Sequence, residues 1–176
     1  MKIFIIGFMA SGKTTIGREL ANALQFKFID LDDFIESRHN QTIKQLFEFK
    51  GEDFFRKVEN EALKEVCDYK DDYVISAGGG TSCFYNNIDF MNRNGITVYL
   101  RMEVATLVSR LIESKIDRPL LWGKTGDELA DYILRVLDER KKFYDKAQLV
   151  VDGDNLNPAE LAQLISAIVR EEKNLS

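Results

Sequence analysis

The stretch GFMASGKTTIG, residues 7–17, has the residue types and spacing of a phosphate-binding loop, G-x-x-x-x-G-K-[ST]. Glycines let such a loop curl until successive N–H groups point at phosphate. Lys13 would reach the β- and γ-phosphates, and the Thr14 hydroxyl could ligate Mg²⁺. The alternative is a glycine turn before an ordinary helix. We predict a site for ATP or GTP. The residues expected to form it are Gly7, Ala10, Ser11, Gly12, Lys13, Thr14 and Thr15.

Two aspartates follow in the stretch FIDLDDFIE, residues 28–36. If the chain is extended at this strand end, its period of two points Asp30 and Asp32 the same way. Ligands of open α/β sheets bind at such strand ends, where two carboxylates could hold Mg²⁺ and accept a hydroxyl proton. The alternative, equally open at this point, is that both acids only cap the following helix.

An arginine lies between two glutamates in GEDFFRKVENEAL, residues 51–63. Glu52, Arg56 and Glu59 are spaced four and three residues apart, so they share one face of a helix. One interpretation is a surface ladder of ion pairs. The other is an arginine held rigid and aimed at an anionic substrate, because its planar fork suits a carboxylate.

Three glycines end the apolar stretch VISAGGG, residues 74–80. At the end of a buried strand, Gly78, Gly79 and Gly80 would allow a ligand to approach the backbone closely.

Two further arginines follow these glycines. Arg118, in the stretch IDRPLL, lies in an irregular segment from which it could close over phosphates and stabilise developing charge. Arg140, in ERKKFY, lies in a helical pattern and is followed by two lysines. An ordinary solvated position is the alternative for each arginine.

The elements that must position these residues alternate between strands and helices. Apolar runs predict strands at residues 2–6, 27–29, 73–76, 96–100 and 149–151. Helical patterns predict helices at residues 12–24, 32–38, 42–49, 52–67, 82–92, 104–111 and 127–146, and from Pro158 onward. The alternation predicts a mostly parallel sheet covered on both faces. Residues 34–60 contain no strand, and residues 114–126 are polar and irregular, as in a mobile loop.

Composition sets further bounds. The 176 residues, 45% of them hydrophobic, suit one domain with its own core. A net charge of −5 gives no reason to expect nucleic acid or a membrane as partner, so local positive charge must hold any anionic ligand. Two cysteines without close spacing predict neither a disulfide framework nor a zinc site. The N-terminal apolar run is too short for a signal peptide. We expect a cytoplasmic protein.

In this order, GFMASGKTTIG, DLD, GE-x-x-FR-x-x-E, GGG, RPLL and ER-x-x-x-Y resemble the shikimate kinase family over nearly the whole chain. The resemblance implies a three-layer α/β/α P-loop fold, like that of nucleoside monophosphate kinases, with a five-stranded parallel sheet. It implies one kinase domain over residues 1–176, with a helical substrate-binding insert at about 31–61 and a mobile lid at about 112–126. The implied reaction is transfer of the ATP γ-phosphate, with Mg²⁺, to the 3-hydroxyl of shikimate in aromatic amino-acid biosynthesis. The expected enzyme is a monomer.

The resemblance also implies a role for each matching residue. Asp30 would bind Mg²⁺ with Thr14, and Asp32 would bind shikimate hydroxyls and serve as the candidate base. Arg56 and Arg140 would clamp the shikimate carboxylate. The remaining matches are Lys13 for the phosphates, Gly78, Gly79 and Gly80 for the substrate, Arg118 of the lid for the phosphates, and Arg110 and Asn157 for the adenine side of ATP.

Two positions and one separation depart from the family pattern. Ala10 stands where a glycine is frequent, so alanine must adopt the conformation that the loop needs. Asn40 also replaces a common glycine, and asparagine tolerates left-handed φ and ψ. The separation of Arg110 from Arg118 is one residue longer than usual.

Two alternative functions remain. The first is another P-loop small-molecule kinase, with gluconate or a nucleotide as acceptor, which would not need two carboxylate-clamping arginines together with the triple glycine. The second is a non-catalytic nucleotide-binding module.

Overall fold

Five parallel strands form one sheet in the computed structural model, which describes residues 1–114 and 126–174. Their order across the sheet is β2-β3-β1-β4-β5. The strands are β1 Lys2–Ile6, β2 Lys27–Asp30, β3 Tyr73–Ser76, β4 Ile96–Arg101 and β5 Leu149–Asp152. Because every pairing is parallel, the carboxyl ends of all five strands lie along one edge of the sheet. The predicted five-stranded parallel sheet is confirmed.

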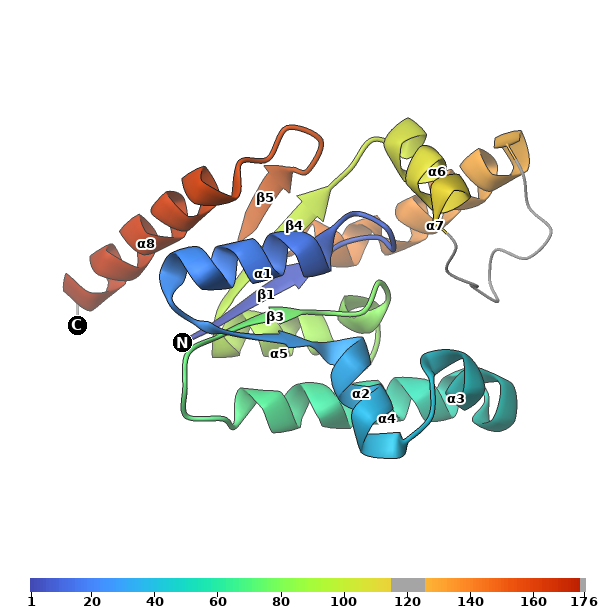
Figure 1. Cartoon of the computed structure of the whole chain (residues 1–176), viewed down its shortest axis with the longest axis horizontal. Helices are drawn as coiled ribbons and strands as arrows, with labels where there is room; N and C mark the ends of the chain where they lie inside the picture. Colours follow the sequence, from blue (N-terminus) through green and yellow to red (C-terminus); the bar gives the residue numbers. More distant parts are fainter. Residues whose placement is uncertain (115–125, 175–176) are drawn as a thin grey trace.

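Helices cover both faces of this sheet (Figure 1). Successive side chains of β1 point to opposite faces, so they show which helices pack on each face. Ile3 and Ile5 are buried in a core with α1 (Lys13–Leu24) and α8 (Pro158–Asn174). Phe4 and Ile6 point the opposite way, into the largest core. This largest core also contains residues of α4 (Glu52–Cys67), α5 (Asn87–Asn94) and α7 (Gly126–Tyr144). The fold is therefore a three-layer α/β/α arrangement, as predicted.

Two groups of helices extend beyond the central layers. The first consists of α2 (Leu31–His39) and α3 (Ile43–Lys50), which pack against α4 on the side of β2 (Figure 1). The second is α6 (Val104–Glu113), which packs on α7 around a third apolar core. Asn40 ends α2 with a φ of 49°, which confirms that asparagine adopts a left-handed conformation there.

The helix predicted at residues 82–92 is wrong in its first half. A short 3-10 turn, η1 (Thr81–Cys83), follows the triple glycine, and α5 starts only at Asn87. Tyr85 and Asn86 between them have positive φ values of 50° and 57°, which an α-helix cannot include. The Asn87 side chain stabilises this turn by donating to the Thr81 carbonyl across 2.8 Å.

The domain boundaries predicted from the sequence coincide only partly with helix boundaries. The insert expected at residues 31–61 covers α2, α3 and the first ten residues of α4, which continues without a break to Cys67. Of the lid expected at residues 112–126, the segment 115–125 lies outside the described residues. None of the helices within residues 1–114 and 126–174 has the length and apolar character needed to cross a membrane.

Candidate active site

The loop that joins β1 to α1 holds the phosphate-binding motif. A Cβ at Gly7, where φ is 147°, would lie 2.7 Å from the carbonyl oxygen of Leu100, so only glycine fits there. Gly12 caps the N-terminus of α1 with a φ of 92°. Ala10 has a φ of 63°, so an alanine here adopts a backbone conformation that glycine adopts at lower cost.

Lys13 is the first residue of α1, and its side chain reaches back over the loop, where Nζ donates to the carbonyl of Phe8 across 2.7 Å. Together with the N-terminus of α1, its ammonium group places positive charge beside a cavity of about 260 Å³, which we call the phosphate cavity. Gly7 and Ser11 lie in the same loop and are buried. The phosphate cavity is lined by Met9, Ala10, Gly12, Lys13, Thr14, Thr15, Asp30, Asp32, Ser76, Ala77, Gly78 and Gly79.

The extended backbone assumed for residues 30–32 is wrong, because β2 ends at Asp30 and α2 begins at Leu31. Asp30 is the N-cap of α2, and its Oδ1 accepts a hydrogen bond from the Asp32 N–H across 3.0 Å. Its Oδ2 accepts from the Thr14 hydroxyl across 2.6 Å. Asp30 therefore caps the helix and also lies beside the hydroxyl predicted to ligate a metal. A hydroxyl and a carboxylate are the oxygen donors that Mg²⁺ prefers.

Arg56 lies deep in α4 and is 6% exposed. Its Nη1 donates to Glu59 Oε2 across 2.9 Å, and its Nη2 donates to Glu52 Oε1 across 3.1 Å. The guanidinium also lies 4.4 Å from the centre of the Phe84 ring. Arg56 is thus held on three sides, which excludes the surface ladder and agrees with the alternative of a rigid arginine.

Glu59 is the buried partner that fixes Arg56. The carboxylate is 1% exposed and also accepts a hydrogen bond from the Thr81 hydroxyl. Burial raises the pKa of Glu59, whereas the charge of Arg56 and the Thr81 hydrogen bond lower it. Arg56 and Glu59 therefore depend on each other, because removing either leaves a buried charge without its partner.

The triple glycine is needed because side chains pack directly against its backbone. A Cβ on Gly78 would lie 2.7 Å from Glu59 Oε1 and 2.9 Å from Asp32 Oδ1. A Cβ on Gly80 would lie 2.8 Å from Nη2 of Arg56. The missing side chains thus leave room for Asp32, Glu59 and Arg56 to reach this end of β3.

A second arginine reaches the triple glycine from α7. The Nη1 of Arg140 donates to the Gly79 carbonyl across 2.8 Å, and the Tyr144 hydroxyl donates to the same oxygen across 2.7 Å. Arg56 on α4 and Arg140 on α7, 84 positions apart in the chain, therefore lie at the same glycine turn.

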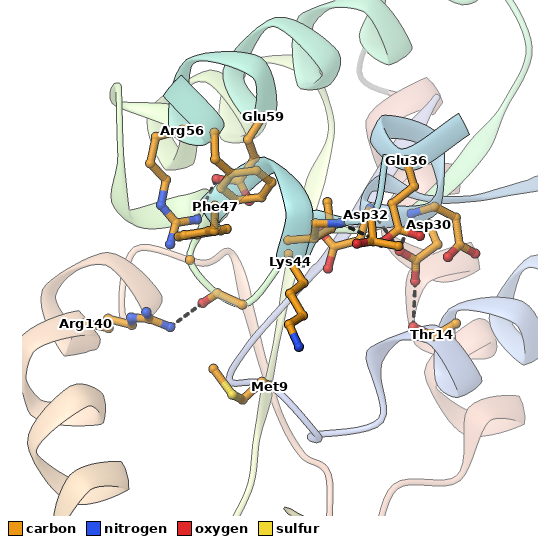
Figure 2. Close-up of a pocket in the computed structure, with 17 residues that line it drawn as sticks. Met9, Thr14, Asp30, Asp32, Glu36, Lys44, Phe47, Arg56, Glu59 and Arg140 are labelled. Atoms are coloured by element: carbon orange, nitrogen blue, oxygen red, sulfur yellow. Dashed lines mark hydrogen bonds and ion pairs between the residues drawn. The ribbon is translucent and has the colours of Figure 1, made fainter. Parts of the chain in front are cut away.

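These side chains surround a second cavity of about 570 Å³, which we call the acceptor cavity (Figure 2). Its cationic end contains Arg56 and Arg140, and its acidic end contains residues of α2 next to Thr14 (Figure 2). The full lining is Met9, Thr14, Asp30, Asp32, Asp33, Glu36, Thr42, Ile43, Lys44, Phe47, Phe55, Arg56, Glu59, Gly78, Gly79, Gly80 and Arg140. The size and mixed lining suit a small molecule that bears both an anionic group and hydroxyls.

Sequence reasoning missed several residues of this lining. Lys44 and Phe47 come from α3, and Figure 2 shows the Lys44 side chain pointing into the cavity. Glu36 adds an acidic side chain one turn beyond Asp32 and Asp33 on α2. Burial, together with the charges of Asp30 and Glu36, raises the pKa of Asp33. The helical periodicity of residues 42–49 was visible, but it does not say which face of the helix meets a ligand.

Among the described residues, Arg110 and Asn157 lie outside both cavity linings, as do Gly7 and Ser11 of the phosphate loop. The Arg110 guanidinium donates to the Ser11 carbonyl across 3.1 Å, so it packs on the outside of the phosphate loop. Asn157 accepts from the Ala159 N–H across 3.0 Å and so caps α8. Arg118 lies outside the described residues. The nucleotide roles of Arg110, Asn157 and Arg118 stay predictions.

Comparisons with known proteins show what the whole chain is similar to. The family model described as shikimate kinase matches residues 9–170. The chain is 40% identical to a shikimate kinase of Parabacteroides distasonis over 96% of this chain and 98% of that protein. It superposes on the crystal structure of shikimate kinase from Bacteroides thetaiotaomicron with a TM-score of 0.88 and 41% identity, covering 97% and 98% of the two chains. For shikimate kinase from Acinetobacter baumannii in complex with shikimate, the TM-score is 0.84 at 32% identity, covering 98% and 94%.

Proposed function

The chain belongs to the shikimate kinase family, and on this premise we propose that it transfers the γ-phosphate of ATP to the 3-hydroxyl of shikimate. The products are shikimate 3-phosphate and ADP. The hydroxyl oxygen forms a bond to the γ-phosphorus, the bond from that phosphorus to the β,γ-bridging oxygen breaks, and the hydroxyl proton passes to a base.

One observation carries this proposal, namely that the phosphate cavity and the acceptor cavity meet. A phosphate held by the loop would therefore lie next to a hydroxyl held in the acceptor cavity, with little to separate them. Phosphoryl transfer depends mainly on such positioning and on the neutralisation of charge. The six residues that line both cavities are Met9, Thr14, Asp30, Asp32, Gly78 and Gly79.

The cationic end of the acceptor cavity would hold the shikimate carboxylate. Arg56 and Arg140 each present a planar guanidinium, which can make two parallel hydrogen bonds to a carboxylate. Asp32 lines both cavities, so a hydroxyl bound to its carboxylate would face the γ-phosphate. In this arrangement Asp32 orients the attacking oxygen and is the candidate acceptor of its proton.

The donor side rests on the phosphate loop. Lys13 and the N–H groups at the start of α1 would neutralise the β- and γ-phosphates. Thr14 and Asp30 would hold Mg²⁺, which when bound neutralises charge on the phosphates of ATP. We assign Arg118 to the same phosphates from the proposed lid at about 112–126, and Arg110 and Asn157 to the adenine side.

The proposal includes the state and compartment of the enzyme. We propose that residues 1–176 act as a single-domain, cytoplasmic monomer with ATP and shikimate as its ligands, without a nucleic acid or membrane partner. Light scattering of the purified protein should give a mass close to the chain mass of 20.2 kDa. A mass near twice that value would contradict the monomer.

A coupled ADP-release assay tests the function directly. Mg-ATP is offered with shikimate, quinate, gluconate and nucleoside monophosphates in parallel. We expect turnover with shikimate well above the background hydrolysis of ATP. Turnover of gluconate or a nucleotide but not of shikimate would support the first alternative, and nucleotide binding without turnover of any acceptor would support the second.

A further inference from the structure

The carbonyl oxygen of Gly79 accepts two hydrogen bonds from one helix. Arg140 donates across 2.8 Å and Tyr144 donates across 2.7 Å. The two residues are four positions apart on α7, so their side chains lie on the same face of that helix. The spacing of the stretch ERKKFY thus has a direct structural meaning, because it brings an arginine and a hydroxyl to one acceptor.

Tyr144 is the fixed member of this pair. It is 1% exposed, and its ring stacks on that of Tyr99 with 4.7 Å between the ring centres. Burial raises the pKa of Tyr144, so the hydroxyl keeps its proton and remains a donor at neutral pH. The ring of Tyr144 is therefore held by the core, and Tyr144 itself is not part of the lining of the acceptor cavity.

Arg140 is the member that faces the acceptor cavity. Its guanidinium has five N–H donors, and an approaching carboxylate needs two of them in parallel. Turning the guanidinium toward that carboxylate would weaken its bond to Gly79. The Gly79 oxygen would still be satisfied, because Tyr144 continues to donate to it.

We propose that Tyr144 is a positioning residue for the acceptor site. It holds the Gly79 carbonyl, so the triple-glycine turn stays in place while Arg140 engages the anionic group of the acceptor. This inference rests on the proposed function for the identity of the acceptor, but the geometry of the turn can be tested without any acceptor.

Tyr144→Phe is the first test, since it removes one oxygen atom and keeps the stacked ring. We expect the KM for shikimate to rise about three- to tenfold while the KM for ATP stays within about twofold of the wild type. Tyr99→Phe is the matched control, because it removes a hydroxyl from the partner ring of the same stack. Equal changes in the two variants, or a loss seen only in kcat, would overturn the inference.

A double-mutant cycle shows whether Tyr144 holds the turn when Arg140 does not. In an Arg140→Lys background, the Tyr144 hydroxyl still donates to the Gly79 carbonyl, so the added Tyr144→Phe change should raise the KM for shikimate by at least as much as it does in the wild type. A change of less than about twofold in that background would mean that Tyr144 does not hold the turn, and would contradict the proposal.

Hydrogen–deuterium exchange of the protein without ligands separates this inference from the proposed function. A peptide that covers residues 78–83 should exchange faster in Tyr144→Phe than in the wild type or in Tyr99→Phe. Unchanged exchange of this peptide would contradict the positioning role of Tyr144 even if shikimate is the substrate. Faster exchange would support it even if the wild type used another acceptor.

Discussion

Thr14 and Asp30 are joined by a hydrogen bond of 2.6 Å from hydroxyl to carboxylate, although sixteen positions separate them in the chain. Thr14 lies in the first turn of α1, and Asp30 caps α2. The bond therefore links the phosphate loop to the start of the helices that line the acceptor cavity. It also places the two proposed Mg²⁺ ligands next to each other.

Asp30→Asn should separate the capping role of Asp30 from its proposed metal role. Asparagine caps a helix as well as aspartate does, so the melting temperature should change little. Loss of the negative charge should raise the Mg²⁺ concentration that gives half-maximal activity by about ten- to a hundredfold. A titration of activity with Mg²⁺ at saturating ATP measures this.

Asp33→Asn is the control for that titration. Asp33 lies in the same first turn of α2 and lines the acceptor cavity, but it is not part of the lining of the phosphate cavity, and its carboxylate pairs with Arg18 across 4.0 Å. The Mg²⁺ requirement of this variant should match that of the wild type. If both variants needed the same increase in Mg²⁺, general loss of acidic charge would explain the effect and the assignment of Asp30 would be wrong.

Arg56→Lys should impair use of shikimate without impairing nucleotide binding. Lysine keeps a positive charge beside Glu59 but lacks the planar fork, so kcat/KM for shikimate should fall at least about tenfold. The affinity for a fluorescent ADP analogue should stay the same. Equal losses of both would contradict the role of Arg56. Arg135→Lys, an exposed position on α7, is the control.

Lysine is a better choice than alanine at this position. Arg56→Ala would leave Glu59 buried without its ion-pair partner, which costs about 3–5 kcal/mol of stability in comparable cases. Chemical denaturation should show this loss for Arg56→Ala and a much smaller one for Arg56→Lys. A stable Arg56→Ala variant would mean that Glu59 is satisfied by other groups.

Ala10→Gly should stabilise the protein, because glycine adopts the observed φ of 63° without strain. After the greater freedom of glycine in the unfolded chain is subtracted, we expect a gain of about 0.5–1 kcal/mol. Ala167→Gly, at an exposed position in the middle of α8, should lose about 1 kcal/mol. Denaturant titrations of both variants measure the two effects, and a loss at both positions would contradict strain at Ala10.

Lys44→Gln should weaken capture of the acceptor more than any later step. The ammonium group of Lys44 points into a cavity that we propose binds a carboxylate (Figure 2). We expect kcat/KM for shikimate to fall about three- to fivefold, and to depend less on salt than in the wild type. Lys50→Gln, at the end of the same helix, is the control. A similar loss in both variants would make the effect one of net charge.

The sheet was predictable because each strand is marked by a continuous apolar run, and its order of strands and helices allows few alternatives. The phosphate loop was predictable because its chemistry is local in sequence. The conformation around Asp30 was not, because the start of α2 one residue earlier than expected depends on an N-cap that the strand pattern does not reveal. The helix predicted at residues 82–92 failed for a similar reason, since Tyr85 adopts a left-handed conformation that its residue type does not favour.

Parts of the acceptor cavity could not be predicted because they depend on tertiary contacts. The burial of Glu59 and the contact of Tyr144 with Gly79 join segments far apart in the chain. From the sequence alone, Lys44 and Phe47 are ordinary members of an amphipathic helix. The roles of Arg56 and Arg140 came from the resemblance to a family, because the local sequence pattern was also compatible with an exposed position for each arginine.

The two ends of the acceptor cavity carry opposite charges, so the site would select ligands by the distance between their anionic group and their hydroxyl. On the proposed function, a ligand would be held productively only when its anionic group reaches Arg56 and Arg140 while one of its hydroxyls reaches Asp32. A hydroxy acid with these groups too close together would bind at one end and leave its oxygen short of the phosphate. A neutral polyol of the right length would lose the anchor at the other end. Selectivity would then follow from the spacing of two groups on the ligand, whatever scaffold joins them.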